Sequence, residues 1–112
     1  MTTISTHILD LALGRPAAGI EVTLERADTA GHFKSVGRGT TDADGRIASF
    51  GGADATASRY RLNFLVEPYF MAQNIVAFFP EVEVLFAVRE GDERCHVPLL
   101  LSPFGYSTYR GS

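Results

Sequence analysis

Residues 20–25 read Ile20-Glu21-Val22-Thr23-Leu24-Glu25, and this stretch decides the class of fold. Apolar and polar side chains alternate at every position, which is the period of a β-strand with one buried face. We therefore expect a half-buried strand whose three aliphatic side chains point into the core.

Period-two patterns recur along the rest of the chain, separated by turn sequences. The first strand is expected to point Ile4 and Ile8 at the core and His7 away from it. Further strands are expected at residues 32–41, 60–66, 81–88, 93–101 and 105–110. Seven or eight short strands with one helix predict an all-β protein, an antiparallel β-sandwich in a single domain spanning residues 1–112.

Three segments interrupt the strand pattern. Asp42-Ala43-Asp44-Gly45 is a tight-turn sequence and places Arg46 at the start of a strand. Residues 51–54 are expected to form a loop, and residues 68–74 the one short helix, with Pro68 near its first turn.

Composition excludes several classes of function. The net charge is −3 and the basic residues are scattered, so no nucleic acid partner is expected. No apolar run approaches the roughly 18 residues of a membrane span, and the first residues carry no leader pattern. Cys95 is the only cysteine, which precludes an intrachain disulfide and agrees with a cytoplasmic location. The three histidines lack zinc-site spacing, so no metal is expected.

The strand expected near residues 94–101 breaks the simple alternation. One parity carries His96, Pro98 and Leu100, and the other carries an apolar set, Cys95, Val97, Leu99 and Leu101. Because a sandwich strand ordinarily keeps one wet face, we expect another subunit to cover the outer face of this sheet.

Few residues could carry chemistry. Histidine transfers protons near neutral pH, and His7 and His96 both lie on outer parities, whereas His32 resembles a surface residue. The simpler interpretation of any one strand histidine is a solvated or hydrogen-bonded side chain. Arg46 is either an exposed hairpin residue or a planar fork of donors for an anion or carbonyl. Tyr109 either packs at a strand end or orients a heterocycle.

The chain closes on Tyr109-Arg110-Gly111-Ser112, directly after a dense run of apolar and aromatic residues. Chain ends are usually frayed and tolerant of change. We expect this closing segment, residues 109–112, to form part of a site.

Four motifs occur together in order. They read Ser5-Thr6-His7-Ile8-Leu9-Asp10, Thr41-Asp42-Ala43-Asp44-Gly45-Arg46, His96-Val97-Pro98-Leu99-Leu100-Leu101-Ser102-Pro103 and Tyr106-Ser107-Thr108-Tyr109-Arg110-Gly111-Ser112. With them the chain resembles, over essentially its whole length, the 5-hydroxyisourate hydrolases, which are transthyretin-related enzymes of purine catabolism. Any one motif would be weak, but the ordered set is specific.

The resemblance implies a fold, an assembly and a reaction. The fold would be a transthyretin-like (prealbumin-like) sandwich of two four-stranded sheets with one short helix. The assembly would be a homotetramer with sites at the dimer–dimer interface. The reaction would open the ring of the small molecule 5-hydroxyisourate at an amide bond, giving 2-oxo-4-hydroxy-4-carboxy-5-ureidoimidazoline in urate catabolism. It would need neither metal nor cofactor.

The resemblance also implies roles for particular residues. The catalytic set would be His7, Arg46, His96 and Ser112, and the substrate-binding set His7, Arg46, Tyr109, Arg110 and Gly111. One histidine would activate water, and the other would polarise the carbonyl or protonate the leaving nitrogen; which does which stays open. Arg46 would stabilise negative charge and Tyr109 would hold the ring. Ser112 and its carboxylate would position water or orient a histidine.

Two other functions compete with this interpretation. Transthyretin, a carrier of thyroid hormone, shares the fold, but transthyretins lack the closing segment and carry lysine at the position of His7. A β-sandwich adhesion or scaffold module gives no reason for two histidines, an arginine and a constrained closing segment to coincide.

Overall fold

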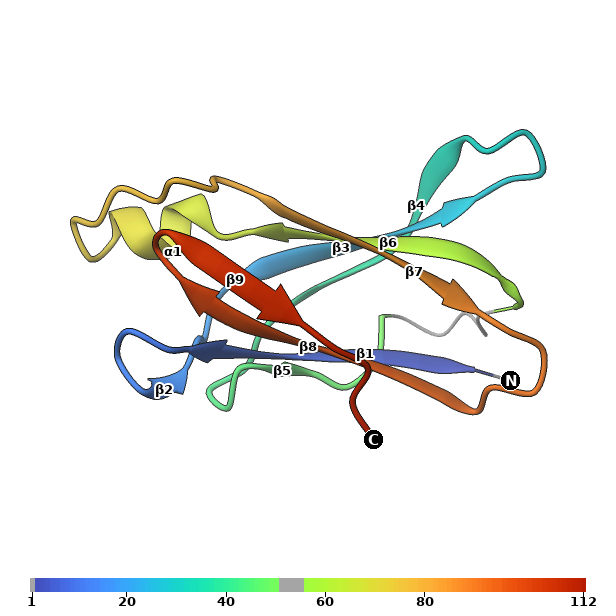
Figure 1. Ribbon diagram of the computed structural model, residues 1–112, viewed down its shortest axis with the longest axis horizontal. Helices are drawn as coiled ribbons and strands as arrows, with labels where there is room; N and C mark the ends of the chain where they lie inside the picture. Colours follow the sequence, from blue (N-terminus) through green and yellow to red (C-terminus); the bar gives the residue numbers. More distant parts are fainter. Residues whose placement is uncertain (1, 51–55) are drawn as a thin grey trace.

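Two β-sheets pack face to face in the computed structural model, which describes residues 2–50 and 56–112 (Figure 1). The first sheet has the strand order β4 (Phe33–Thr40), β3 (Glu21–Ala27), β6 (Ser58–Leu65), β7 (Val82–Val88). The second has the order β2 (Arg15–Pro16), β1 (Thr3–Asp10), β8 (Arg94–Ser102), β9 (Gly105–Thr108), and β5 (Arg46–Ile47) also pairs with β1. The helix α1 (Glu67–Met71) lies at one end of the sandwich (Figure 1).

The predicted sandwich and its short helix are confirmed. The second sheet has five strands because the two-residue strands β2 and β5 both pair with β1. Strand β9 ends at Thr108, two residues before the predicted end, and α1 covers only part of the predicted range with Pro68 in its first turn. The loop predicted at residues 51–54 lies outside the described residues.

One strand pair corrects the expectation of an antiparallel sandwich: β1 and β8 run parallel. An antiparallel pair can be joined by a short hairpin, whereas a parallel pair needs a long connection. Here that connection includes the whole of the other sheet. The direction of β8 beside β1 is therefore set by tertiary packing and not by a local turn.

The core lies between the sheets and follows the predicted alternation. Ile20, Val22 and Leu24 are all buried, as are Ile4 and Ile8 on β1. Cys95 is a buried core residue with a free thiol. In the described part of the chain, no helix has the length and apolar character needed to cross a membrane.

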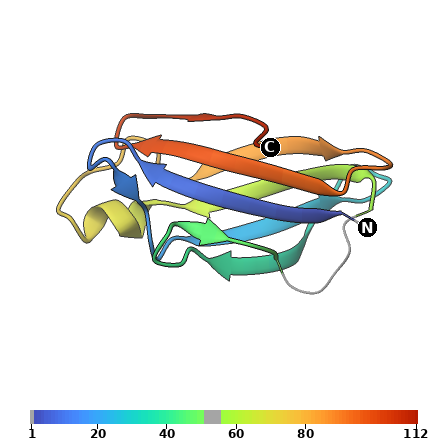
Figure 2. The ribbon, with the colours of Figure 1, turned by 90° about the horizontal axis from the view of Figure 1, so that it is seen from below.

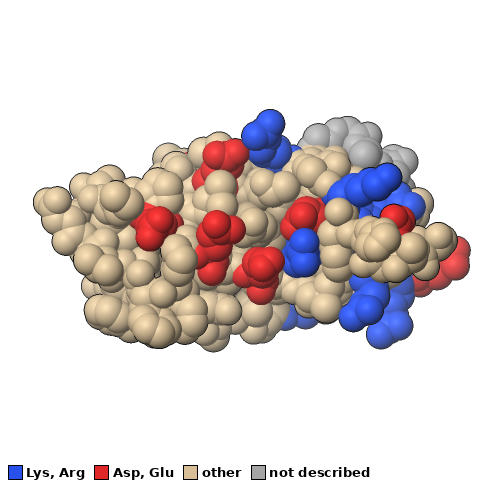
Figure 3. Space-filling model, turned by 90° about the horizontal axis from the view of Figure 1, so that it is seen from above, with Lys and Arg blue, Asp and Glu red and all other residues tan. Residues whose placement is uncertain are grey.

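The outer face of the four-stranded sheet is charged. Figure 3 shows this face, with acidic side chains along its middle and basic ones among them and toward one end. Arg61 Nε donates to Glu25 at 2.9 Å, and the Arg38 guanidinium lies 3.4 Å from Glu21. This face is the wet face that an ordinary sandwich strand presents to water.

A tight turn places Arg46, as predicted. The Asp42 carboxylate accepts backbone N–H groups of Asp44 and Arg46, both at 2.9 Å. Gly45 has φ 74°, in the left-handed region that favours glycine, and a Cβ there would collide with the carbonyl oxygen of Ile8. Without that Cβ the turn can lie against β1, where the Gly45 carbonyl accepts the Ile8 N–H at 2.8 Å. The turn is thereby fixed to β1, and Arg46 follows it as the first residue of β5.

A buried carboxylate joins the end of β1 to α1. Asp10 is 1% exposed and accepts the backbone N–H groups of Ala12 and Leu13 at 2.9 Å. The Tyr69 hydroxyl donates to its other oxygen at 2.6 Å. Burial, together with this hydrogen bond and the charge of Asp10, raises the pKa of Tyr69 to about 12.

The outer parity of β8 is partly covered by the chain itself. Pro98 is already buried in the single chain, while His96 and Leu100 are half-buried. The Thr108 hydroxyl donates to the Pro98 carbonyl at 2.7 Å, and Gly111 lies against the Pro98 ring. Strand β9 and the closing segment therefore supply some of the cover that the sequence led us to expect from another subunit.

Candidate functional site

His7 and Arg46 are brought together by strand pairing. Residue 7 of β1 lies opposite residue 46 of β5 in an antiparallel register. Figure 2, which views the five-stranded sheet from its outer side, shows β5 alongside β1. His7 is half-buried between the buried positions Thr6 and Ile8, and Arg46 is exposed. Both therefore lie on the outer face of the sheet.

His96 joins the same face through the parallel pair of β1 and β8. In this register Ser5 lies opposite His96, and His7 lies opposite Pro98. Paired residues on neighbouring strands project to the same face of a sheet. His96 therefore lies on the same face as His7, and its partner in the register, Ser5, is two residues before His7 in β1.

The environment of His96 favours the neutral imidazole. Burial lowers its pKa below the ordinary value, and the electrostatic interactions with His7 and Arg46 lower it further. The Ser5 hydroxyl lies 2.8 Å from Nδ1 of the ring. In the tautomer whose Nδ1–H donates to this hydroxyl, Nε2 is the unprotonated nitrogen and can accept a proton.

The closing segment returns from β9 toward β8, as Figure 2 shows. The Gly111 N–H donates to the His96 carbonyl at 2.8 Å. A Cβ at Gly111 would lie 2.5 Å from Cδ2 of the His96 ring and 3.2 Å from Cγ of Pro98. Only glycine allows the backbone to approach the imidazole this closely. Tyr109 and Ser112, on either side of this contact, are exposed.

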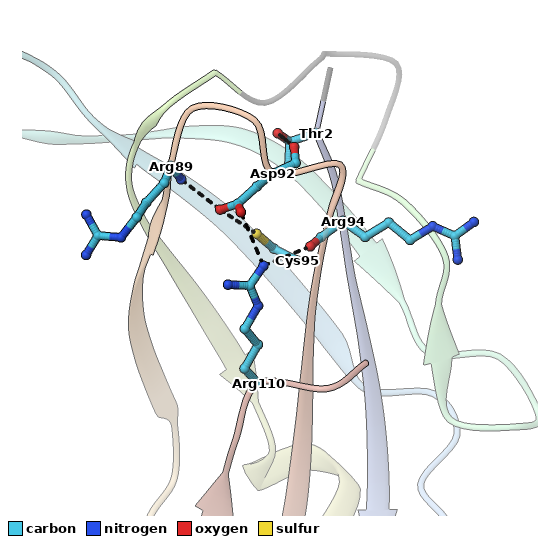
Figure 4. Close-up of polar contacts among 6 residues, drawn as sticks. All are labelled: Thr2, Arg89, Asp92, Arg94, Cys95 and Arg110. Carbon is cyan, nitrogen blue, oxygen red and sulfur yellow. Dashed lines mark hydrogen bonds and ion pairs between the residues drawn. The ribbon is translucent and has the colours of Figure 1, made fainter.

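Arg110 is placed differently from the other predicted substrate-binding residues. Its guanidinium lies 3.4 Å from the Asp92 carboxylate and 3.4 Å from the Arg94 carbonyl (Figure 4). Asp92 belongs to the turn between β7 and β8. The structure thus brings together His7, Arg46, His96 and Gly111, and directs the Arg110 side chain to a neighbouring turn.

A cavity of about 200 Å³ adjoins this region between β7 and the closing segment. Three of the predicted site residues, His96, Tyr109 and Arg110, line this cavity, whereas His7 and Arg46 do not. The remaining lining residues are Val84, Leu85, Phe86, Ala87, Cys95, Val97 and Thr108. The cavity therefore lies on the side of His96 that faces the edge of the sandwich. The cluster of His7, Arg46 and His96 instead lies on the outer face of the sheet.

The cluster combines the positive charge of Arg46 with two imidazoles and suits an electron-rich ligand. Two imidazoles and a guanidinium offer nitrogen donors to carbonyl or anionic oxygen atoms. Within residues 2–50 and 56–112, no three His, Cys, Asp or Glu side chains are arranged to hold a metal ion. The chemistry available to these side chains is proton transfer and stabilisation of negative charge.

The model of the HIUase/Transthyretin family matches residues 4–111. The chain belongs to this family. It is 46% identical to a 5-hydroxyisourate hydrolase of Salmonella dublin over 110 residues, which is 97% of this chain and 80% of that protein. The structure of Klebsiella pneumoniae 5-hydroxyisourate hydrolase matches with TM-score 0.88 at 38% identity, covering all of both chains. Sea bream transthyretin in complex with thyroxine matches with TM-score 0.91 at 30% identity, over 97% of this chain and 94% of that one.

Sequence reasoning gave no role to two residues that the structure places in contact with the predicted set: Ser5, which was quoted only as part of a motif and lies against His96, and Asp92, which lies against Arg110. Ser5 could have been found, because it lies two residues before His7 and therefore shares its outer parity. Asp92 carries no such signal, because its contact with Arg110 joins a turn to a segment beyond the last strand.

Proposed function

We propose that this protein hydrolyses 5-hydroxyisourate, opening the ring at an amide bond to give 2-oxo-4-hydroxy-4-carboxy-5-ureidoimidazoline in urate catabolism. The observation that carries the proposal is the placement of His7, Arg46 and His96 on one outer sheet face, in a member of a family that includes 5-hydroxyisourate hydrolases.

In this scheme His96 is the general base. Its lowered pKa keeps the imidazole neutral at pH 7, so Nε2 can take a proton from water as the water oxygen bonds to the amide carbonyl carbon. The carbon–nitrogen bond then breaks, and the departing nitrogen receives a proton from an imidazolium. His7, which is directly opposite Arg46, is positioned to polarise the carbonyl or to supply that proton.

Arg46 stabilises the negative charge that develops on the carbonyl oxygen. Its backbone begins β5 from a turn that is fixed to β1, so the position from which the guanidinium extends is set before the substrate binds. Tyr109 and Ser112 extend from the closing segment on either side of the Gly111–His96 contact. In the proposal Tyr109 contacts the heterocycle, and the Ser112 hydroxyl helps to position water.

We further propose a homotetramer with sites at the dimer–dimer interface. Large apolar side chains are exposed at the end of the sandwich that carries the β1–β2 and β8–β9 turns: Leu11 is 59%, Leu13 46% and Phe104 76% exposed (Figure 1). Burial of these side chains against a second copy would be favourable, and that copy would wall off the outward-facing cluster from water. A cytoplasmic location agrees with the single free thiol of Cys95.

The test is an ultraviolet assay in which uricase generates the unstable substrate from urate. The protein should accelerate decay of the substrate absorbance. His7→Asn and His96→Asn should each reduce the rate by about 100-fold, because each removes a positioned proton-transfer group. His32→Asn is the matched control, since the His32 side chain is 79% exposed at a distant hairpin. Unchanged substrate decay with the native protein would refute the proposal.

Thyroid-hormone binding is the alternative, favoured by the likeness to the thyroxine-bound transthyretin structure. It predicts tight binding of thyroxine with no effect on substrate decay. Titration of thyroxine by calorimetry on the same preparation separates the two functions.

A further inference from the structure

The closing segment leaves the sheet at Thr108, where β9 ends, yet Gly111 has to lie against His96. Residues that follow the last strand of a domain fray unless something holds them. The backbone bond from Gly111 to His96 is one such contact. The side chain of the neighbouring Arg110 makes another, and that contact joins the segment to a different part of the chain.

The β7–β8 turn is a well-fixed point to which Arg110 binds. The Asp92 Oδ2 atom accepts the Arg89 backbone N–H at 2.9 Å, which closes the turn, and the Cys95 thiol points at the same oxygen from 3.9 Å (Figure 4). The Thr2 hydroxyl donates to the Asp92 carbonyl, and the Thr3 N–H donates to the Glu93 carbonyl at 2.9 Å. The turn is therefore bonded to the start of β1.

The second carboxylate oxygen of Asp92 is used by Arg110. Oδ1 accepts from Nη2 of Arg110 at 3.4 Å, and the same nitrogen lies 3.4 Å from the Arg94 carbonyl. The Asp92 side chain is 20% exposed and the Arg110 side chain is 65% exposed, so the ion pair lies at the surface. The hydrogen bond from Arg89 and the charge of Arg110 lower the pKa of Asp92, so the carboxylate is ionised at neutral pH.

We propose that Asp92 is a positioning residue, which acts by binding Arg110 and thereby holding Gly111 against His96. Arg110 is then also a positioning residue, whose guanidinium faces a turn of the fold in place of the substrate. The inference rests on the proposed function for its effect on catalysis. The contact itself, however, can be measured without any substrate.

Two single variants and their combination test the contact. Arg110→Gln removes the guanidinium without touching the turn, and Asp92→Asn removes the charge from the other side. Either should accelerate hydrogen exchange of the Gly111 amide, read by NMR, by about two- to fivefold, the range expected for an exposed ion pair. Each should lower kcat/KM for 5-hydroxyisourate by a similar factor. The double variant should be no worse than either single one, because both act through one contact.

Arg94→Gln is the matched control. It removes a neighbouring positive charge, but the Arg94 side chain extends away from Asp92 and its carbonyl is kept (Figure 4). Arg94→Gln should change neither the hydrogen exchange of the Gly111 amide nor the rate of hydrolysis. Arg110→Lys, which retains a cation on a long side chain, should restore part of both quantities.

Three results would overturn the inference. Asp92→Asn could leave Gly111 exchange and hydrolysis unchanged while Arg110→Gln loses activity, which would place Arg110 in direct contact with substrate. Hydrogen exchange of the Gly111 amide could become faster in both variants while the rate of hydrolysis stays the same, which would show that the contact does not affect catalysis. Additive losses in the double variant would show that the two residues act independently. A native protein without hydrolytic activity would instead refute the proposed function, and Gly111 exchange would still decide whether the contact holds the segment.

Discussion

The Ser5 hydroxyl oxygen lies 2.8 Å from Nδ1 of His96, although the two residues are 91 positions apart in the sequence. The parallel register of β1 and β8 places them directly opposite each other. This contact fixes the plane of the imidazole on an open sheet face and leaves Nε2 as the nitrogen available to a ligand.

Ser5→Ala should therefore slow hydrolysis by about two- to tenfold, the worth of one hydrogen bond that orients a reacting group. The loss should fall mainly on kcat, since the hydroxyl contacts the imidazole and not the substrate. Ser5→Thr, which keeps the hydroxyl, should recover most of the rate. Ser107→Ala, an exposed serine of β9, serves as the control. Steady-state kinetics on the four proteins would decide the matter, and equal kcat values for Ser5→Ala and the native protein would exclude an orienting role.

Replacing Arg46 by glutamine should raise the pKa of His96, because it removes the positive charge of the guanidinium, whose electrostatic interaction lowers that pKa. NMR titration of the histidine ring protons measures this directly. Since the folded-state pKa lies below the ordinary 6.5, the neutral ring contributes stability above that pH, and this contribution is lost as pH falls through the lowered value. The variant should show a smaller loss of stability in this window and an acid limb of activity shifted to higher pH. A pKa that stays the same in Arg46→Gln would show that the guanidinium is too distant or too well solvated to act.

Gly111→Ala should reduce hydrolysis by about 10- to 100-fold, because the added methyl group would overlap the His96 ring and displace either the ring or the closing segment. Gly105→Ala is the matched control in the same part of the chain: the nearest atom to a Cβ there is the Ser102 hydroxyl at 3.9 Å, which is ordinary contact. Chemical-shift changes confined to His96 and its neighbours should accompany the loss in Gly111→Ala. Full activity in that variant would mean that Gly111 does not lie against the imidazole in solution.

Tyr69→Phe should lower the free energy of unfolding by about 1–3 kcal/mol at pH 7, because the buried Asp10 carboxylate loses a donor. The pKa of Tyr69 is raised from 10.0 to about 12, so the protonated hydroxyl is favoured in the folded state. Its stabilisation is complete below pH 10 and is lost as pH rises through this window.

The stability difference between native protein and Tyr69→Phe should consequently shrink between pH 10 and pH 12, as followed by urea unfolding monitored by circular dichroism. Tyr106→Phe, at an exposed tyrosine, should cost little at any pH. A constant difference across the alkaline range would mean that the hydroxyl of Tyr69 does not bind Asp10.

Local patterns predicted the strands well because burial on one face of a strand imposes a period of two. The alternation at residues 20–25 fixed which side chains of β3 enter the core, and the aspartate–glycine turn at residues 42–45 fixed where Arg46 begins β5. The apolar outer parity of β8 was also visible, but its cover was assigned entirely to another subunit. Pro98 is in fact buried within the single chain, in contact with the closing segment.

By itself, then, the sequence determined the all-β class, the positions of the longer strands and the outward direction of His7 and His96, since each follows from the identity of adjacent residues. Only the tertiary structure decided that β1 and β8 pair in parallel, that Ser5 binds His96, and that Asp92 holds Arg110. The physical reason is register. Which residue lies opposite which depends on how whole sheets pack, and a shift of one residue along β8 would move His96 from the outer face to the core.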